Sequence, residues 1–108
     1  MIYLACPYSH PNRDIRVARF NAANRAAAAL MAQGKHVFSP ISHTHPIAEA
    51  GDLPLDWDFW ASYDRTILGV CCEVVVLMLD GWKESKGVTA EIAIARELGL
   101  SITHMRPY

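Results

Sequence analysis

The chain has no long hydrophobic run, little cysteine and almost no net charge. Its apolar stretches are far shorter than the roughly 20 residues that span a bilayer, so no transmembrane helix is expected. A formal net charge of -1 gives no global field for nucleic acid or an anionic membrane, although a local basic patch is compatible with it. No basic segment precedes an apolar run at the amino terminus, so we expect no signal peptide and a cytoplasmic protein.

The cysteines and glycines exclude further classes of protein. Cys6, Cys71 and Cys72 make an odd count with two adjacent members, which indicates core thiols rather than a disulfide framework. No C-x-x-C redox motif is present. The sequence also lacks a Walker A loop and a G-x-G-x-x-G turn, so no standard phosphate motif covers it.

What remains is the composition of an ordinary folded domain. The 108 residues are 52% hydrophobic and 19% charged, which is enough for one domain with one core. No internal repeat, linker or low-complexity tract divides the chain, so residues 1–108 are expected to form a single domain.

Short apolar runs alternate with segments of helical period along the chain. The expected strands are Ile2–Cys6, Lys35–Ser39, Glu73–Leu79 and Ser101–Met105, and the expected helices are Arg13–Gln33, Asp56–Val70 and Gly87–Leu98. The segment Ile41–Leu55 contains two prolines and one glycine and has no sustained period. We therefore predict that it is a long loop.

This alternation predicts a small, doubly wound α/β sandwich of three layers, Rossmann- or flavodoxin-like, with a mainly parallel sheet of four or five strands. The run Glu73–Leu79 is apolar almost throughout, which is typical of a strand buried on both faces. Ligands of such sheets bind beyond the carboxyl ends of the strands. The loops Pro7–Asn12, Pro40–Pro54 and Asp80–Lys86 follow strands, so the site is expected among them.

The loop and helix start DGWKESKGVTAE carry the most informative polar residues. Asp80 closes a buried strand, and Ser85 and Gly87 lie at the start of a helix, where free N–H groups favour an anion. Gly87 lets a ligand approach the backbone closely. Glu91 lies one turn further on and is expected to point back toward the loop. On spacing alone, Ser85 as an N-cap and Glu91 as a surface residue are equally good interpretations.

Three stretches resemble one known superfamily. They are IYLACPY at the amino terminus, the strand EVVVLML, and the run S-x-G-x-x-x-E formed by Ser85, Gly87 and Glu91. They resemble the nucleoside 2-deoxyribosyltransferases, a superfamily that includes the nucleoside 5'-monophosphate N-glycosidases. The chain is also similar to a small bacterial branch of it, the DUF1937-type proteins. The resemblance covers nearly the whole chain in element order and implies glycosyl-transfer chemistry without a cofactor or metal.

The resemblance implies a role for several residues. Glu91 matches the catalytic glutamate that attacks the anomeric carbon of the sugar, and Tyr3 matches the tyrosine that orients it. Ser85 matches the serine that contacts a 5'-phosphate. Asp64 roughly matches, at a slightly different spacing, an aspartate that helps to protonate the leaving base. Asp80 is an alternative polar contact to the sugar or base.

The first loop, CPYSHPNRD, departs from the glycine- and serine-rich turn of the phosphate hydrolases. Pro7 lacks the N–H donor that such a turn offers. Tyr8, beside it, is expected to contact the substrate. Arg13 or Arg16 can take the place of the missing donor through its guanidinium group.

The histidines and aromatic residues allow more than one interpretation. His43 and His45 can share a metal when a third ligand converges, but no spacing requires one. We therefore expect no metal, and expect the two histidines to line the base pocket or to be satisfied within their loop. The aromatic residues of Trp57–Tyr63 can stack a base, but their helical spacing favours the core or a dimer contact. The resemblance implies a homodimer or homotetramer, with this segment as a candidate contact.

Two functions are compatible with these features. The first is that of a nucleoside or nucleoside 5'-monophosphate N-glycosidase, or a related deoxyribosyltransferase, acting through Glu91 on a small molecule and not on a nucleic acid polymer. The second is that of a non-catalytic nucleotide-binding or sensing module with the same fold. A purely structural domain would leave the polar loop Asp80–Lys86 unexplained.

Overall fold

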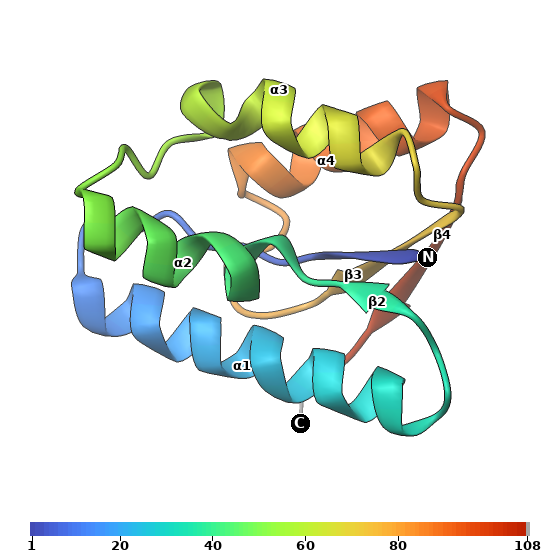
Figure 1. Ribbon diagram of the computed structural model, residues 1–108, viewed down its shortest axis with the longest axis horizontal. Helices are drawn as coiled ribbons and strands as arrows, with labels where there is room; N and C mark the ends of the chain where they lie inside the picture. Colours follow the sequence, from blue (N-terminus) through green and yellow to red (C-terminus); the bar gives the residue numbers. More distant parts are fainter. Residues whose placement is uncertain (108) are drawn as a thin grey trace.

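Four parallel strands form one sheet in the computed structural model, which describes residues 1–107 (Figure 1). The strands are β1 (Ile2–Ala5), β2 (Val37–Phe38), β3 (Glu73–Leu77) and β4 (Ser101–Met105), in the spatial order β2-β1-β3-β4. The helices are α1 (Arg13–Ala32), α2 (Pro40–Gly51), α3 (Trp57–Leu68) and α4 (Lys86–Glu97). The prediction of a small Rossmann-like α/β sandwich is confirmed.

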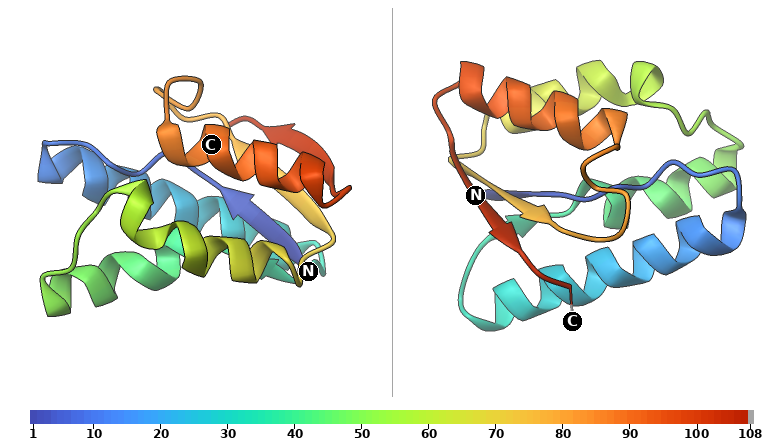
Figure 2. Two further views of the ribbon diagram at one scale, coloured as in Figure 1. Left: turned by 90° about the horizontal axis from the view of Figure 1, so that it is seen from above. Right: turned by 180° about the vertical axis from the view of Figure 1, so that it is seen from behind.

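The sheet separates two layers of helices. Figure 1 shows α1 and α2 on one face and α3 and α4 on the other, and the view from behind in Figure 2 shows the same arrangement. Because side chains alternate along a strand, Leu4 and Val75 pack toward α1, whereas Tyr3 and Val74 pack toward α3 and α4. Both faces of β1 and β3 are therefore buried, which explains their apolar sequences.

The order of the strands places a crevice between β1 and β3. In the register of the sheet, Tyr3 lies beside Val74 of β3 and Phe38 of β2. The chain leaves β1 toward α1 on one face and leaves β3 toward α4 on the other. The two loops therefore diverge at the carboxyl ends of these strands, which is where doubly wound folds bind ligands.

The prediction of a loop over Ile41–Leu55 is wrong, because α2 occupies most of this segment. Pro40 lies at the start of the helix, where its missing N–H group has no partner to lose. Pro46 does remove one hydrogen bond from the helix interior. Packing outweighs this cost, since Ile41, His45 and Ala48 are buried on one face of α2 and the ring of His45 lies 4.4 Å from that of Phe20 in α1.

The remaining boundaries differ from the predictions by a few residues. The strand Ser101–Met105 is confirmed as predicted, β3 ends two residues early, and β2 is reduced to Val37–Phe38. Among residues 1–107, no helix combines the length and apolar character needed to cross a membrane.

The packing of α3 on the sheet gives a first prediction. Leu68 is 0% exposed and belongs to the same core cluster as Tyr3 and Val74. Leu68→Ala should lower the free energy of unfolding by about 2–5 kcal/mol in urea denaturation, because it leaves a cavity in this cluster. Leu98→Ala is the matched control, since Leu98 is 46% exposed and surface substitutions change stability by only about 0.5 kcal/mol. Equal losses in the two variants would contradict this packing.

Candidate active site

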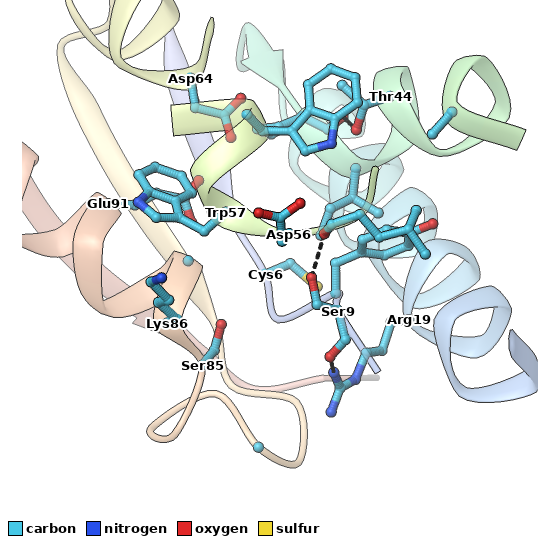
Figure 3. Close-up of a pocket in the computed structure, with 18 of the residues that line it drawn as sticks. Cys6, Ser9, Arg19, Thr44, Asp56, Trp57, Asp64, Ser85, Lys86 and Glu91 are labelled. Atoms are coloured by element: carbon cyan, nitrogen blue, oxygen red, sulfur yellow. Dashed lines mark hydrogen bonds between the residues drawn. The ribbon is translucent and has the colours of Figure 1, made fainter. Parts of the chain in front are cut away.

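A cavity of about 460 Å³ opens at the carboxyl ends of β1 and β3 (Figure 3). Its walls come from the end of β1, the loops after β1 and β3, and parts of all four helices. The polar and aromatic residues that line it are Cys6, Tyr8, Ser9, Arg19, Thr44, Asp56, Trp57, Trp60, Asp64, Glu84, Ser85, Lys86 and Glu91. The cavity therefore lies at the edge of the sheet where the sequence predicted a site.

Three buried polar side chains lie together beside this cavity, and two of them, Asp64 and Glu91, line it. Tyr3 is 0% exposed and donates its hydroxyl hydrogen to Oε2 of Glu91, which is 5% exposed. Asp64 is 7% exposed, and its Oδ1 atom is buried without a hydrogen-bond partner among residues 1–107. The interpretation of Glu91 as a surface residue is wrong. Glu91 and Tyr3 are in contact, and the catalytic roles that the resemblance implied for them stay predictions.

The carboxylates occupy positions that an amphipathic helix normally gives to apolar residues. Glu91 lies on the buried face of α4 between Val88 and Ile94. Asp64 lies one turn before Leu68 on the buried face of α3. The same periodicity that packs the two helices on the sheet therefore carries both carboxyl groups inward.

Burial raises the pKa values of Glu91, Asp64 and Tyr3. Burial raises the pKa of Glu91 to about 8, although the hydrogen bond from Tyr3 opposes it, and the charge of Asp64 raises it further. Burial also raises the pKa of Asp64 to about 6, with Tyr3 opposing. The pKa of Tyr3 is raised by burial and by the charge of Glu91, so its hydroxyl remains a donor. The two carboxyl groups therefore titrate as a pair that holds one proton near neutral pH.

The thiol of Cys6 also lines the cavity and is expected to be unreactive. Burial, aided by the charge of Glu91, raises the pKa of Cys6 to about 12, so it remains a neutral thiol. All three cysteines are free. The prediction of core thiols is confirmed for Cys6 and Cys71 but is wrong for Cys72, which is exposed.

The start of α4 forms another part of the wall. The Oγ atom of Ser85 caps the helix by accepting a hydrogen bond from the N–H group of Val88 at 3.2 Å. The same hydroxyl lines the cavity and can donate its own hydrogen to a ligand. Lys86 and Gly87 also line the cavity, and Lys86 Nζ lies 3.1 Å from Asp58 Oδ1. This helix start is thus both capped and open to a ligand.

Arg19 is a residue of this site that the sequence analysis missed. Its guanidinium group donates to the carbonyl oxygens of Ser9 and Asp80, both at 3.1 Å, and so joins the loops after β1 and β3. Gly81 leaves room for the Arg19 guanidinium group, because a Cβ atom at this position would lie 2.9 Å from an Arg19 nitrogen. The helical spacing of Arg19 with Ala23, on the sheet-facing side of α1, was the signal that could have identified it.

The arginines proposed as phosphate partners are engaged elsewhere. Arg13 forms a two-bond ion pair with Glu49, at 2.8 and 2.9 Å. Arg16 donates to the carbonyl oxygens of His10 and Pro11. Neither lines the main cavity. Both line a smaller cavity of about 340 Å³ beside it.

His43 and His45 have different environments in α2. His45 is buried, and its Nδ1 atom is hydrogen-bonded to the hydroxyl of Tyr8, which lines the cavity. His43 is exposed and its ring stacks 6.2 Å from that of Tyr63. Neither histidine lines the cavity, and no three potential metal ligands converge in the described part of the chain.

The other residues predicted for the site are divided between the cavity wall and its surroundings. Neither Pro7, which is fully buried, nor Asp80, whose backbone carbonyl accepts from Arg19, lines the cavity. Of the aromatic residues in α3, Trp57 and Trp60 line the cavity. Phe59 and Tyr63 are exposed to solvent.

The sequence matches a family of proteins over almost its whole length. A family model described as "Domain of unknown function (DUF1937)" matches residues 1–106. No curated protein sequence matches the chain significantly.

The burial of Glu91 predicts an unusual dependence of stability on pH. Because its pKa is raised to about 8, the folded protein keeps a proton that the unfolded chain loses above about pH 4.5, so stability should fall between these values. Glu91→Gln removes this effect and keeps an acceptor for Tyr3. Relative to wild type, the variant should gain on the order of 2 kcal/mol between pH 4 and pH 8 in urea denaturation.

Glu97→Gln, at the exposed end of the same helix, is the control for this measurement. The effect of this substitution should change less with pH. A Glu91→Gln effect that is constant from pH 4 to pH 8 would contradict a buried, protonated Glu91.

Proposed function

The chain belongs to the DUF1937 family, and from the geometry of its pocket we propose that it cleaves the N-glycosidic bond of a nucleoside or nucleoside 5'-monophosphate. The observation that carries this proposal is the pair of buried carboxyl groups, Asp64 and Glu91, beside the Tyr3 hydroxyl at the cavity wall. The resemblance to the nucleoside 2-deoxyribosyltransferases supports the same chemistry.

The carboxyl pair lacks the cation that normally accompanies buried acids. Within residues 1–107, neither Asp64 nor Glu91 forms a salt bridge. Burying carboxyl groups in this way is costly, and groups that have such perturbed pKa values and lie in a cleft cluster at functional sites. Breaking an N-glycosidic bond passes through a sugar with the positive charge of an oxocarbenium ion. The pair supplies the negative charge that stabilises such a transition state.

The proposed reaction proceeds in two displacements. Ionised Glu91 attacks the anomeric carbon, the electrons of the C–N bond pass to the base nitrogen, and Asp64 gives this nitrogen its proton. A glycosyl ester on Glu91 results. A water oxygen then attacks the anomeric carbon while Asp64 takes a proton from that water. The electrons of the bond between the sugar and Glu91 return to the Glu91 carboxylate. If a second base replaces water, the same ester transfers the sugar to that base.

Tyr3 positions the nucleophile in this scheme. Its hydroxyl donates to Oε2 of Glu91 and leaves the other carboxyl oxygen for the sugar. The pair has one proton near neutral pH, and the reactive form carries it on Asp64 while Glu91 is ionised.

The rest of the cavity suits the other parts of a nucleotide. Trp57 and Trp60 offer aromatic surface for the base. Ser85, Lys86 and the free N–H groups at the start of α4 offer donors for a 5'-phosphate, and Arg19 adds a second cation at the cavity wall. A cavity of about 460 Å³ lies in the range of small-molecule sites.

One observation favours a second function, that of a nucleotide-binding module without chemistry. With its pKa raised to about 8, Glu91 is mostly protonated at neutral pH in the empty site, and a protonated carboxyl group is a poor nucleophile. In such a module Glu91 would contribute only hydrogen bonds to the ligand.

We also retain the proposal of a homodimer or homotetramer. Two helices that line the cavity also carry exposed apolar side chains, which are Ile47 of α2 and Phe59 and Tyr63 of α3. Burying them against a second copy would remove apolar surface from water.

Release of free base tests the proposed activity. Wild-type protein should release base from at least one member of a panel of ribonucleosides, 2'-deoxyribonucleosides and their 5'-monophosphates, followed by chromatography. Glu91→Gln should lower this rate by about 10³-fold or more, because the covalent step is lost. Glu97→Gln on the same helix should retain the wild-type rate.

Full activity of the Glu91→Gln variant would exclude Glu91 as the nucleophile. Binding of nucleotides by the wild-type protein without release of base would favour the non-catalytic module.

The carboxyl pair also predicts a bell-shaped dependence of the rate on pH. The reactive form has one proton on the pair, so kcat/KM should fall below about pH 6, where a second proton blocks Glu91, and above about pH 8, where Asp64 has none to give. Asp64→Asn should abolish the fall of kcat/KM at high pH. The same variant should lose most of its activity on substrates whose base needs protonation. A rate that rises steadily through pH 9 would contradict the shared proton.

A further inference from the structure

Asp56 begins α3 but does not cap it. The N-cap residues of α1 and α4, Asn12 and Ser85, accept hydrogen bonds from backbone N–H groups at 2.8 and 3.2 Å. The carboxylate of Asp56 makes no such bond, and neither does the side chain of Ser39 at the start of α2. Asp56 also has no ion-pair partner among the residues that the structure describes. A capping aspartate stabilises a helix by about 1 kcal/mol, and Asp56 does not supply this capping bond.

The backbone before Asp56 is nevertheless fixed. Ser9 Oγ donates to the carbonyl oxygen of Leu55 at 2.5 Å, and Trp60 Nε1 donates to that of Pro54 at 2.9 Å. Both donors belong to residues that line the cavity. Figure 3 shows the carboxylate of Asp56 amid the lining side chains, beside Trp57. Asp56 is an exposed residue at the cavity wall, and two hydrogen bonds fix the backbone that precedes it.

Contacts between α3 and α4 bring the start of α3, where Asp56 lies, close to the start of α4. The first turns of the two helices are adjacent, since Lys86 pairs with Asp58 and the nearest neighbour of a Cβ atom at Gly87 would be Trp57, at 3.6 Å. Glu91 lies one turn beyond Gly87. In the proposed function the phosphate lies at the start of α4 and the anomeric carbon at Glu91. The sugar then occupies the stretch between them, and Asp56 lines the same cavity.

The chemistry of a carboxylate selects its partner within this stretch. An ionised carboxylate only accepts hydrogen bonds and repels a phosphate. The donors that nucleosides share, whatever their base, are the hydroxyl groups of the sugar. Resting on the proposed function, we propose that Asp56 accepts hydrogen bonds from the 2'- or 3'-hydroxyl of the sugar and so determines which sugars the site prefers.

A binding cycle with unphosphorylated nucleosides tests this assignment. Dissociation constants for adenosine, 2'-deoxyadenosine and 3'-deoxyadenosine are measured by calorimetry with wild type, Asp56→Ala and Asp56→Asn. Removing the contacted hydroxyl should weaken binding to the wild type by about tenfold or more, the usual worth of a hydrogen bond to a charged group. In Asp56→Ala the same removal should change binding less than twofold, and Asp56→Asn should lie between.

Asp58→Asn is the control, because it removes a carboxylate from the same helical turn outside the cavity. It should keep the full penalty for the missing hydroxyl. Thermal unfolding of each variant verifies that α3 remains folded, and Asp56→Asn keeps the test open if Asp56→Ala does not fold.

The outcomes separate this inference from the proposed reaction. An equal hydroxyl penalty in wild type and Asp56→Ala overturns the role of Asp56, even where base release shows the enzyme to be active. A penalty that depends on Asp56 supports it, even where no base is released. If the wild type binds none of the three nucleosides, the role of Asp56 is overturned together with nucleoside recognition.

Discussion

The hydrogen bond from the Tyr3 hydroxyl to the carboxyl group of Glu91 is the contact on which the site depends. It joins β1, at the centre of the sheet, to α4, across a distance of 88 residues in sequence. Both groups are buried, so each would be costly to leave without its partner. Together with the buried side chains of Val88 and Ile94, their pairing holds α4 on the sheet, and with it the helix start that carries Ser85 and Lys86.

Elements defined by their own residues could be predicted from the sequence. The apolar run of β3 and the strand Ser101–Met105 needed only local composition, and the alternation of strands and helices was enough to predict the doubly wound fold. The helix α2 could not be found in this way. Its proline and lack of period argue against a helix locally, and its stability comes from the burial of Ile41 and Ala48 against neighbouring elements.

The site was predictable to a similar extent. Resemblance pointed to Glu91, Tyr3 and Asp64, and the structure brings Glu91 and Tyr3 into contact and places Asp64 near them. The sequence did not identify Arg19 and Asp56 as residues of the cavity. Their assignment depends on hydrogen bonds that are visible only in the folded chain. Arg19 reaches two carbonyl oxygens on loops distant in sequence, and Asp56 differs from an ordinary helix cap only in the bond that it fails to make.

The carboxyl groups assigned to function share the lack of a cationic partner among residues 1–107. Asp64 and Glu91 lie on the buried faces of helices, one Asp64 oxygen has no hydrogen-bond partner within the described residues, and Asp56, like Ser39 of α2, makes no capping bond. Each of these features lowers the stability of the isolated chain, and all three carboxyl groups belong to residues that line one cavity. A ligand with a positive anomeric centre and hydroxyl donors would give all three a partner at once. Their convergence therefore argues for a sugar in this cavity more strongly than any one residue does.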